Sequence, residues 1–381
     1  MFKKKKILRI ISSLDPKSGG PAIAIVDSTK LLNSLGFSID ILTHDSKNSN
    51  YAKIKDTSII NIGPSIGNYK INFKIILWLI KNHKKYDLFI IHGLWQINTL
   101  LAYFLLKKRY HVFTHGQLDP FFSKNKLKML KKVIYWYLFE RRNLLNAKSL
   151  LLTSELEKKS LSKTFVNTAK IKKKVTNYGV LKPNINLKNS KIKFLNKFKK
   201  FKNKNFFIFI GRFHEKKGCE IIIELVKYFK MSNKPIKILM CGPESPYKDY
   251  LKDLSKKYFL NDYIHWAGFL YKDLKWGALS SAKAMLLPSH GENFGVSVTE
   301  SLLCGTPVIT TNKVNIHKYI SKHNAGFISN SRHTDFIKSV DKFNKLDRHQ
   351  IHNLSLNAKK CFDMNFNLKK QIHVLAKHLN D

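Results

Sequence analysis

Short apolar runs alternate along the chain with longer segments of helical pattern, and turn residues such as glycine and proline separate them. Short apolar runs bounded by turns are typical of buried strands. The predicted strands lie at residues 6–13, 37–43, 58–62, 86–92, 110–114, 147–153, 171–176, 206–210, 236–241, 263–266, 284–287 and 308–310. Strands that alternate with helices indicate an α/β fold built on parallel sheets.

The length of 381 residues and the hydrophobic content of 44% predict two packed domains. Residues 181–204 are rich in lysine and asparagine and show little pattern, which is typical of a linker. The expected division is therefore an N-terminal domain at 1–180, a linker at 181–204, a second domain at 205–364 and a final helical segment at 365–381. Widely separated cysteines fit a reducing compartment.

The segment 284–310 reads as a strand, a turn-rich loop, a helix at 296–304 that Gly305 ends, and another strand. Ligands of parallel sheets bind beyond the carboxyl ends of the strands, and a helix N-terminus favours a phosphate there. Glu292 lies in the loop, and Glu300 follows about one turn into the helix. The two carboxylates either face one ligand, or Glu292 caps the helix and Glu300 is solvated.

Four further strand ends carry candidate binding residues. Arg212 and Lys217 follow the strand at 206–210 in a loop with glycines at both ends, an arrangement that suits a diphosphate or is simply a surface loop. Gly19 and Gly20 follow the first strand, as a phosphate- or sugar-approach loop or a tight turn. His92 and His115 end two strands, where both are expected to point into a cleft.

The formal net charge is +44, and the excess of lysine is spread over both halves of the chain. Drift in an AT-rich genome explains such a composition, and so does attraction to an anionic surface, either membrane or nucleic acid. No run of 18 apolar residues occurs, so we expect no transmembrane helix. No Asp-x-Asp motif occurs either, so we expect no metal on bound phosphates.

Three segments carry a family resemblance. Pro288-Ser289-x-x-Glu292-x-Phe294-Gly295, followed by Glu300 and Gly305-x-Pro307-Val308-Ile309, resembles the paired-glutamate signature of retaining GT-B glycosyltransferases of family 4, also called glycosyl transferases group 1. Gly211-Arg212-Phe213-x-x-x-Lys217-Gly218 resembles their diphosphate motif, and the segment around His115-Gly116 is similar to that of their polysaccharide and lipopolysaccharide branch. The resemblance implies two Rossmann-like doubly wound domains that face each other across a cleft, with the last helix crossing back to the first domain.

The resemblance also implies a role for each candidate residue. Glu292 would hold donor-sugar hydroxyls, and His115 would contact the donor sugar near the reacting carbon, so these two are the expected catalytic residues. The expected donor-binding residues are Gly19, Gly20, Arg212, Lys217, Asn293, Phe294, Gly295 and Glu300. Arg212 and Lys217 would grip the diphosphate, Glu300 would hold the ribose, and the backbone around Phe294 and Gly295 would lie against the diphosphate or sugar.

The implied activity is transfer of a sugar from a nucleotide-diphospho-sugar to a saccharide or lipid-linked acceptor, with retention of configuration and without a cofactor or metal. The basic, apolar segment 122–142 resembles the lipid-contacting helices of membrane-associated relatives. We therefore expect a cytoplasmic protein that is peripheral on the inner face of the bacterial cytoplasmic membrane. The donor nucleotide, the sugar and the acceptor stay open.

Two other functions compete with transfer. One is a sugar-nucleotide epimerase or a phosphorylase of the same fold, against which the Arg212/Lys217 and Glu292/Glu300 pairs argue. The other is a basic nucleic-acid-binding protein. The even spread of charge and the lack of a basic–aromatic recognition motif argue against nucleic acid as a partner.

Overall fold

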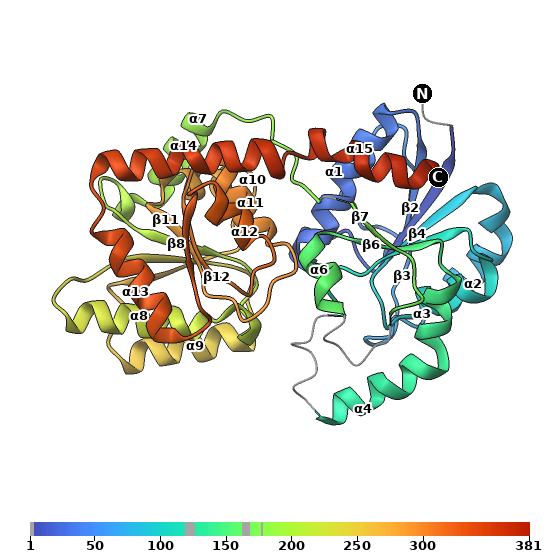
Figure 1. The fold of residues 1–381 in the computed structure, drawn as a ribbon, viewed down its shortest axis with the longest axis horizontal. Helices are drawn as coiled ribbons and strands as arrows, with labels where there is room; N and C mark the ends of the chain where they lie inside the picture. Colours follow the sequence, from blue (N-terminus) through green and yellow to red (C-terminus); the bar gives the residue numbers. More distant parts are fainter. Residues whose placement is uncertain (1–3, 119–125, 162–167, 177) are drawn as a thin grey trace. The chain divides into compact units, whose positions relative to one another are not determined.

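The computed structural model describes residues 4–118, 126–161, 168–176 and 178–381, and it divides into two compact units (Figure 1). The first unit comprises residues 1–181 together with 368–381, and the second comprises residues 182–367. Each unit is built on its own parallel sheet, so the α/β fold with two parallel-sheet domains that the sequence predicts is confirmed. The cleft between the domains stays a prediction.

Within the described residues, the sheet of the first unit has seven strands in the order β3-β2-β1-β4-β5-β6-β7. All its pairings are parallel. The strands are β1 (Lys6–Ile11), β2 (Ser38–Ser46), β3 (Ile59–Gly63), β4 (Leu88–His92), β5 (Tyr110–Phe113), β6 (Ser149–Leu152) and β7 (Lys173–Val175). Alternate side chains feed two cores, since Leu8 and Ile10 pack into one apolar cluster and Ile7 into another.

The sheet of the second unit has six described strands in the order β10-β9-β8-β11-β12-β13, again all parallel. They are β8 (Phe207–Ile210), β9 (Ile238–Cys241), β10 (Ile264–Gly268), β11 (Ala284–Leu287), β12 (Val308–Thr311) and β13 (Gly326–Ser329). The predicted strand at 284–287 is confirmed at both ends. Chain order reverses between β8 and β11, where parallel sheets form their ligand crevice.

Helices connect the strands of each unit. The first unit has α1 (Gly20–Ser34), α2 (Phe73–Asn82), α3 (Ile97–Leu105), α4 (Lys126–Tyr135), α5 (Arg141–Asn146), α6 (Glu155–Ser160) and α15 (Leu368–Asn380). The second has α7 (Leu187–Lys197), α8 (Cys219–Met231), α9 (Pro246–Lys257), α10 (Lys272–Ser281), α11 (Val296–Leu303), α12 (His317–Lys322), α13 (His333–Asn344) and α14 (Arg348–Asn365). In the described part of the chain, none of these helices is both long enough and apolar enough to cross a membrane.

The final helix α15 completes the first unit. Its apolar face, with Ile372, Leu375 and Leu379, packs into the same cluster as Ile7 of β1. The Lys5 ammonium donates to the carbonyls of Leu379 and Asn380 at 2.9 and 2.7 Å, which closes the C-terminal end of the helix. The last residues of the chain therefore belong to the core of the first sheet.

One predicted segment differs from the structure. The range 181–204, expected to be a linker, contains α7, which buries Ser190 and Phe194 against α10 at the point where Gly277 lets the two backbones meet. Because α7 buries only two side chains and is otherwise rich in lysine, its sequence has little of the apolar periodicity that predicts a helix. The segment 122–142, which resembles lipid-contacting helices, is helical from residue 126 onward, because α4, a π-helical turn at Trp136–Glu140 and α5 follow one another without a break. Residues 122–125 lie outside the described residues.

Candidate active site

Two loops of the second unit lie at the reversal point of its sheet. Residues 211–218 follow β8, and residues 288–295 follow β11, the strand beside it. The His290 amide donates to the Lys216 carbonyl at 2.8 Å, and the Ser289 hydroxyl donates to the same oxygen at 2.8 Å. Two bonds to one carbonyl hold the loops edge to edge.

Gly218 makes this contact close. Its φ is +66°, and a Cβ built on it would lie 2.2 Å from the Pro288 carbonyl oxygen, nearer than real Cβ atoms approach a backbone oxygen. Gly218 is also the N-cap of α8. A side chain at this position would therefore separate the two loops.

Lys217 and Glu292 meet across the joined loops as an ion pair, and each side chain is only 18% exposed. Burial, followed by the charges of Arg212 and Lys216, pushes the pKa of Lys217 down, while the adjacent Glu292 carboxylate favours its charged form. Arg212 is exposed and close enough to act on Lys217. The structure thus brings Arg212, Lys217 and Glu292 together.

The start of α11 excludes the capping role for Glu292. The N-cap is Gly295, at φ +76°, and no side chain caps the helix. The Glu292 amide instead donates to the Lys313 carbonyl at 3.0 Å, so this residue bridges to the chain after β12. Phe294 is buried, and its ring centroid lies 5.8 Å from that of Phe366.

Glu300 is buried on α11 rather than solvated. The Lys275 ammonium of α10 donates to its Oε1 at 2.6 Å, and the Glu300 side chain is 5% exposed. The two carboxylates of the predicted signature are therefore both paired with lysines. Asn293 contacts Asn315 at 3.5 Å, beside Glu292 in the loop.

The candidate residues of the first unit lie around β1, β4 and β5, neighbours or near neighbours in its sheet. Gly19, at φ +120°, is the N-cap of α1, and Gly20 is the first helical residue. His115 has a left-handed φ of +48° directly after β5, a conformation that costs a non-glycine residue energy and is frequent at functional sites. His92 ends β4, and its Nδ1 lies 2.9 Å from His115 Nε2.

Comparison with known proteins gives a family-model match, a sequence relative and two similar structures. Residues 190–361 match the family model described as glycosyl transferases group 1. Over 349 residues, 91% of each chain, the sequence is 23% identical to an uncharacterized 41.2 kDa protein in the cps region of Klebsiella pneumoniae. The structure is similar to sucrose-phosphate synthase from Thermosynechococcus elongatus (TM-score 0.81, 18% identity, 98% of each chain). It is also similar to HepE of Anabaena in complex with UDP-glucose (TM-score 0.74, 15% identity, 98% of this chain and 99% of that one).

These matches support a glycosyltransferase with the GT-B fold. The range that matches the family model covers the joined loops, the Lys217–Glu292 pair and Glu300. The residues of the first unit lie outside it. The individual roles assigned to the site residues stay predictions.

Glu157 makes contacts near His115 that the sequence did not disclose. The Ser154-x-x-Glu157 pattern predicts a capping box, and Ser154 does accept from the Glu157 amide at 3.1 Å. The Glu157 carboxylate, however, does not return to the Ser154 amide. It accepts from Thr114 Oγ1 at 2.7 Å, the Gly116 amide at 3.2 Å, and the amide and hydroxyl of Thr153. This buried carboxylate therefore holds the loop that carries His115.

Lys275 and Gln117 were also missed. Lys275 pairs with Glu300 from a helix 25 residues away, and Gln117 Oε1 accepts from the Leu94 amide at 2.5 Å, which ties the loops after β4 and β5. Neither contact leaves a local sequence signal, because each depends on the fold bringing distant segments together.

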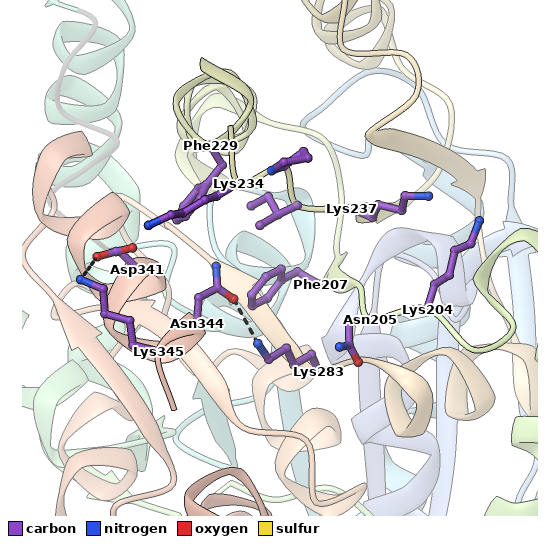
Figure 2. A pocket seen from close by; sticks show the side chains of 12 residues that line it. Lys204, Asn205, Phe207, Phe229, Lys234, Lys237, Lys283, Asp341, Asn344 and Lys345 are labelled. Atoms are coloured by element: carbon purple, nitrogen blue, oxygen red, sulfur yellow. Dashed lines mark hydrogen bonds and ion pairs between the residues drawn. The ribbon is translucent and has the colours of Figure 1, made fainter. Parts of the chain in front are cut away.

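A cavity of about 560 Å³ lies elsewhere in the second unit, at the amino ends of β8, β9 and β11 (Figure 2). Its lining is rich in lysine, and Lys345 is paired there with Asp341 at 2.8 Å. None of the predicted site residues lines it. The candidate active site and this cavity thus lie at opposite ends of the strands of one sheet.

Proposed function

We propose that the protein transfers a sugar from a nucleotide-diphospho-sugar to a saccharide or lipid-linked acceptor, with retention of configuration and without a metal on the phosphates. The observation that carries this proposal is the half-buried Lys217–Glu292 pair with Arg212 beside it. Cations near a carboxylate are the complement of a sugar diphosphate, whose phosphates need positive charge and whose hydroxyls need an acceptor.

In the proposed reaction the bond between the anomeric carbon and the diphosphate oxygen breaks. A bond from the acceptor oxygen to the same face of that carbon forms, and the acceptor proton passes to the leaving diphosphate. Arg212, Lys217 and the N-terminus of α11 neutralise the charge that develops on the diphosphate. Glu292 orients the sugar through its hydroxyls, and Glu300 holds the ribose.

The proposed setting is the assembly of a bacterial surface polysaccharide, supported by the relative from a cps region. A peripheral position at the inner face of the cytoplasmic membrane is part of the proposal. Leu130, Ile134 and Leu138 are spaced one helical turn apart and are 57, 52 and 54% exposed. An exposed apolar stripe on a chain of charge +44 complements an anionic bilayer.

Binding of UDP-, GDP- and ADP-sugars, followed by thermal shift with and without EDTA, tests the donor and the metal together. We expect one nucleotide class to raise the Tm, UDP-glucose first because HepE is similar in fold, and we expect EDTA to change nothing. Arg212→Ala should abolish the shift. Arg332→Ala is the matched control, since it removes an exposed arginine of the same unit that pairs with Asp335.

The products separate the rivals. Anomeric NMR of the product should show the configuration of the donor, and an inverted product would refute retention. A free sugar phosphate would identify a phosphorylase, and an isomerised nucleotide-sugar an epimerase. Salt-sensitive binding of DNA with a sequence preference, alongside no donor shift, would establish the nucleic-acid alternative.

A further inference from the structure

A buried arginine lies behind the two histidines of the first unit. Arg9 sits inside β1 and is 2% exposed. Its Nε donates to His92 Nε2 at 3.2 Å, and one terminal nitrogen donates to Ser28 Oγ at 2.8 Å, Thr29 Oγ1 at 3.0 Å and the Ile25 carbonyl at 3.3 Å. Arg9 therefore connects α1, which begins at the Gly19-Gly20 loop, to β4.

The hydrogen bonds that run from Arg9 through His92 to His115 determine which ring nitrogen of each histidine carries its proton. The Arg9 guanidinium only donates, so His92 Nε2 must accept and carries no proton. A histidine keeps at least one ring proton, which leaves the His92 proton on Nδ1. Because Nδ1 therefore donates, His115 Nε2, 2.9 Å away, must accept. The His115 proton is then on Nδ1.

We propose that Arg9 and His92 are positioning residues that lock His115 as a neutral imidazole with its proton on Nδ1, so that His115 serves sugar transfer as a hydrogen-bond donor and not as an acid or base. The role of His115 as a hydrogen-bond donor in sugar transfer rests on the proposed function. His115 is partly exposed, and its Nδ1 has no hydrogen-bond partner among the described residues, so the N–H is left for a ligand.

The surroundings of His115 oppose its ionisation. Its ring stacks on Phe113 and His92 and meets the edge of Tyr178 at 6.3 Å. Burial, followed by the charge of Arg9, lowers the pKa of His115 to about 3, and the same two causes lower that of His92. The other titratable groups in this region are Tyr178, whose pKa burial raises, the Glu157 carboxylate on the Gly116 amide, and Asp27 of α1, which acts on Tyr178.

A second proton on His115 would sit on Nε2 and point at His92 Nδ1, which already donates. A second proton on His92 would likewise sit on Nε2 and point at the Arg9 guanidinium. Each would break the bond that holds the rings in place. The rate of transfer should therefore show no imidazole titration between about pH 5 and 8, where an unperturbed histidine changes its charge.

Nitrogen-15 NMR of the full chain labelled at histidine tests the lock directly, and the spectrum of His115→Gln identifies the His115 signals among the 15 histidines. We expect His115 to show a protonated Nδ1 and an unprotonated Nε2 from about pH 5 to 8. A protonated Nε2 or an imidazolium at pH 7 would overturn the proposal. This measurement needs no donor or acceptor, so it is independent of the proposed function.

Two substitutions at His92 separate the lock from mere packing. His92→Leu removes the donor to His115, so a pH-dependent limb should appear in the rate and kcat should fall about tenfold, the value of one lost hydrogen bond. His92→Asn keeps an N–H near the position of Nδ1 and should retain the pH profile of the unsubstituted protein. His111→Leu is the control, because His111 is a buried histidine of the same sheet whose Nδ1 bonds Ser149 instead.

The outcomes of these measurements differ for the two halves of the proposal. A pH profile in His92→Leu that matches that of the unsubstituted protein would show that His92 does not set the protonation of His115. Unchanged transfer in His115→Gln, with the wild-type spectrum as expected, would remove His115 from the reaction and overturn its donor role. The tautomer lock itself would then stand, and the proposed sugar transfer would still be judged by donor binding at Arg212.

Discussion

Gly218→Ala is the substitution for which the structure sets the clearest expectation. It introduces one methyl group at a left-handed position, 2.2 Å from the Pro288 carbonyl oxygen. The two atoms nearest to the added methyl group, the carbonyl oxygen and carbon of Pro288, are backbone atoms, so neither can move aside as a flexible side chain would. The loops at 211–218 and 288–295 must separate, and with them Lys217 and Glu292.

The cost has two parts. A left-handed alanine costs about 1–2 kcal/mol on its own. Separation of the loops also breaks the bonds that His290 and Ser289 make to the Lys216 carbonyl, each worth about 0.5–1.5 kcal/mol. The free energy of unfolding of the second unit should therefore fall by about 2–5 kcal/mol.

Gly268→Ala isolates the clash from the backbone strain. Gly268 has nearly the same φ, +70°, and a Cβ there meets nothing within 4 Å. Urea denaturation of both variants should show Gly268→Ala losing only the left-handed cost, and Gly218→Ala at least about 1 kcal/mol more. Equal losses, or donor affinity unchanged in Gly218→Ala, would refute the idea that this contact holds the two loops together.

Three buried ionisable groups give further expectations, each measured by urea denaturation. Glu157→Gln should lower stability by about 2–3 kcal/mol because its amide cannot accept from all four donors, while the exposed Glu155→Gln should change little. Lys275→Met should cost about 3–5 kcal/mol by leaving Glu300 buried without its cation, and adding Glu300→Gln should restore part of it. Burial raises the pKa of Glu140 from 4.5 to about 8, so between these pH values the native state keeps a proton that the unfolded chain releases. The free energy of unfolding should therefore fall as the pH rises from 4.5 to about 8, and Glu140→Gln should make it less dependent on pH.

The strands and the glycine-bounded loops were predictable because their signals are local. The apolar run at 284–287, the turn at Gly295 and the stop at Gly305 each follow from a few adjacent residues, and the structure reproduces them. Helix α7 was missed because it buries only two side chains. Its pattern is therefore close to that of a solvated, lysine-rich segment.

The pairings within the site could not be predicted from local pattern. Lys217 with Glu292 and Lys275 with Glu300 join residues 75 and 25 positions apart. In a lysine-rich chain no single lysine stands out, so only the fold selects these two. The sequence did carry a signal for Arg9, because a charged residue interrupts the apolar run of β1. The residues on both sides of it in the strand are buried. A buried charge needs partners, and this one has four acceptors.

The choice of arginine at position 9 can itself be tested, because the chain otherwise favours lysine so strongly. The guanidinium reaches His92 with Nε and the three acceptors of α1 with a terminal nitrogen, two directions from one planar group. An ammonium has its three donors on a single atom and cannot serve both. Arg9→Lys should keep the buried charge and the contacts to α1, lose the bond to His92, and lower stability by about 1.5–3 kcal/mol.

His92 would then be free to take its proton on either ring nitrogen, and His115 should show a mixture of tautomers in the nitrogen-15 spectrum. Lys30→Arg, at an exposed position of α1, is the reciprocal control and should change neither the spectrum nor the stability. If Arg9→Lys left the His115 tautomer unchanged, positive charge alone would set it. The geometry of the guanidinium would then be irrelevant to the state of the histidine.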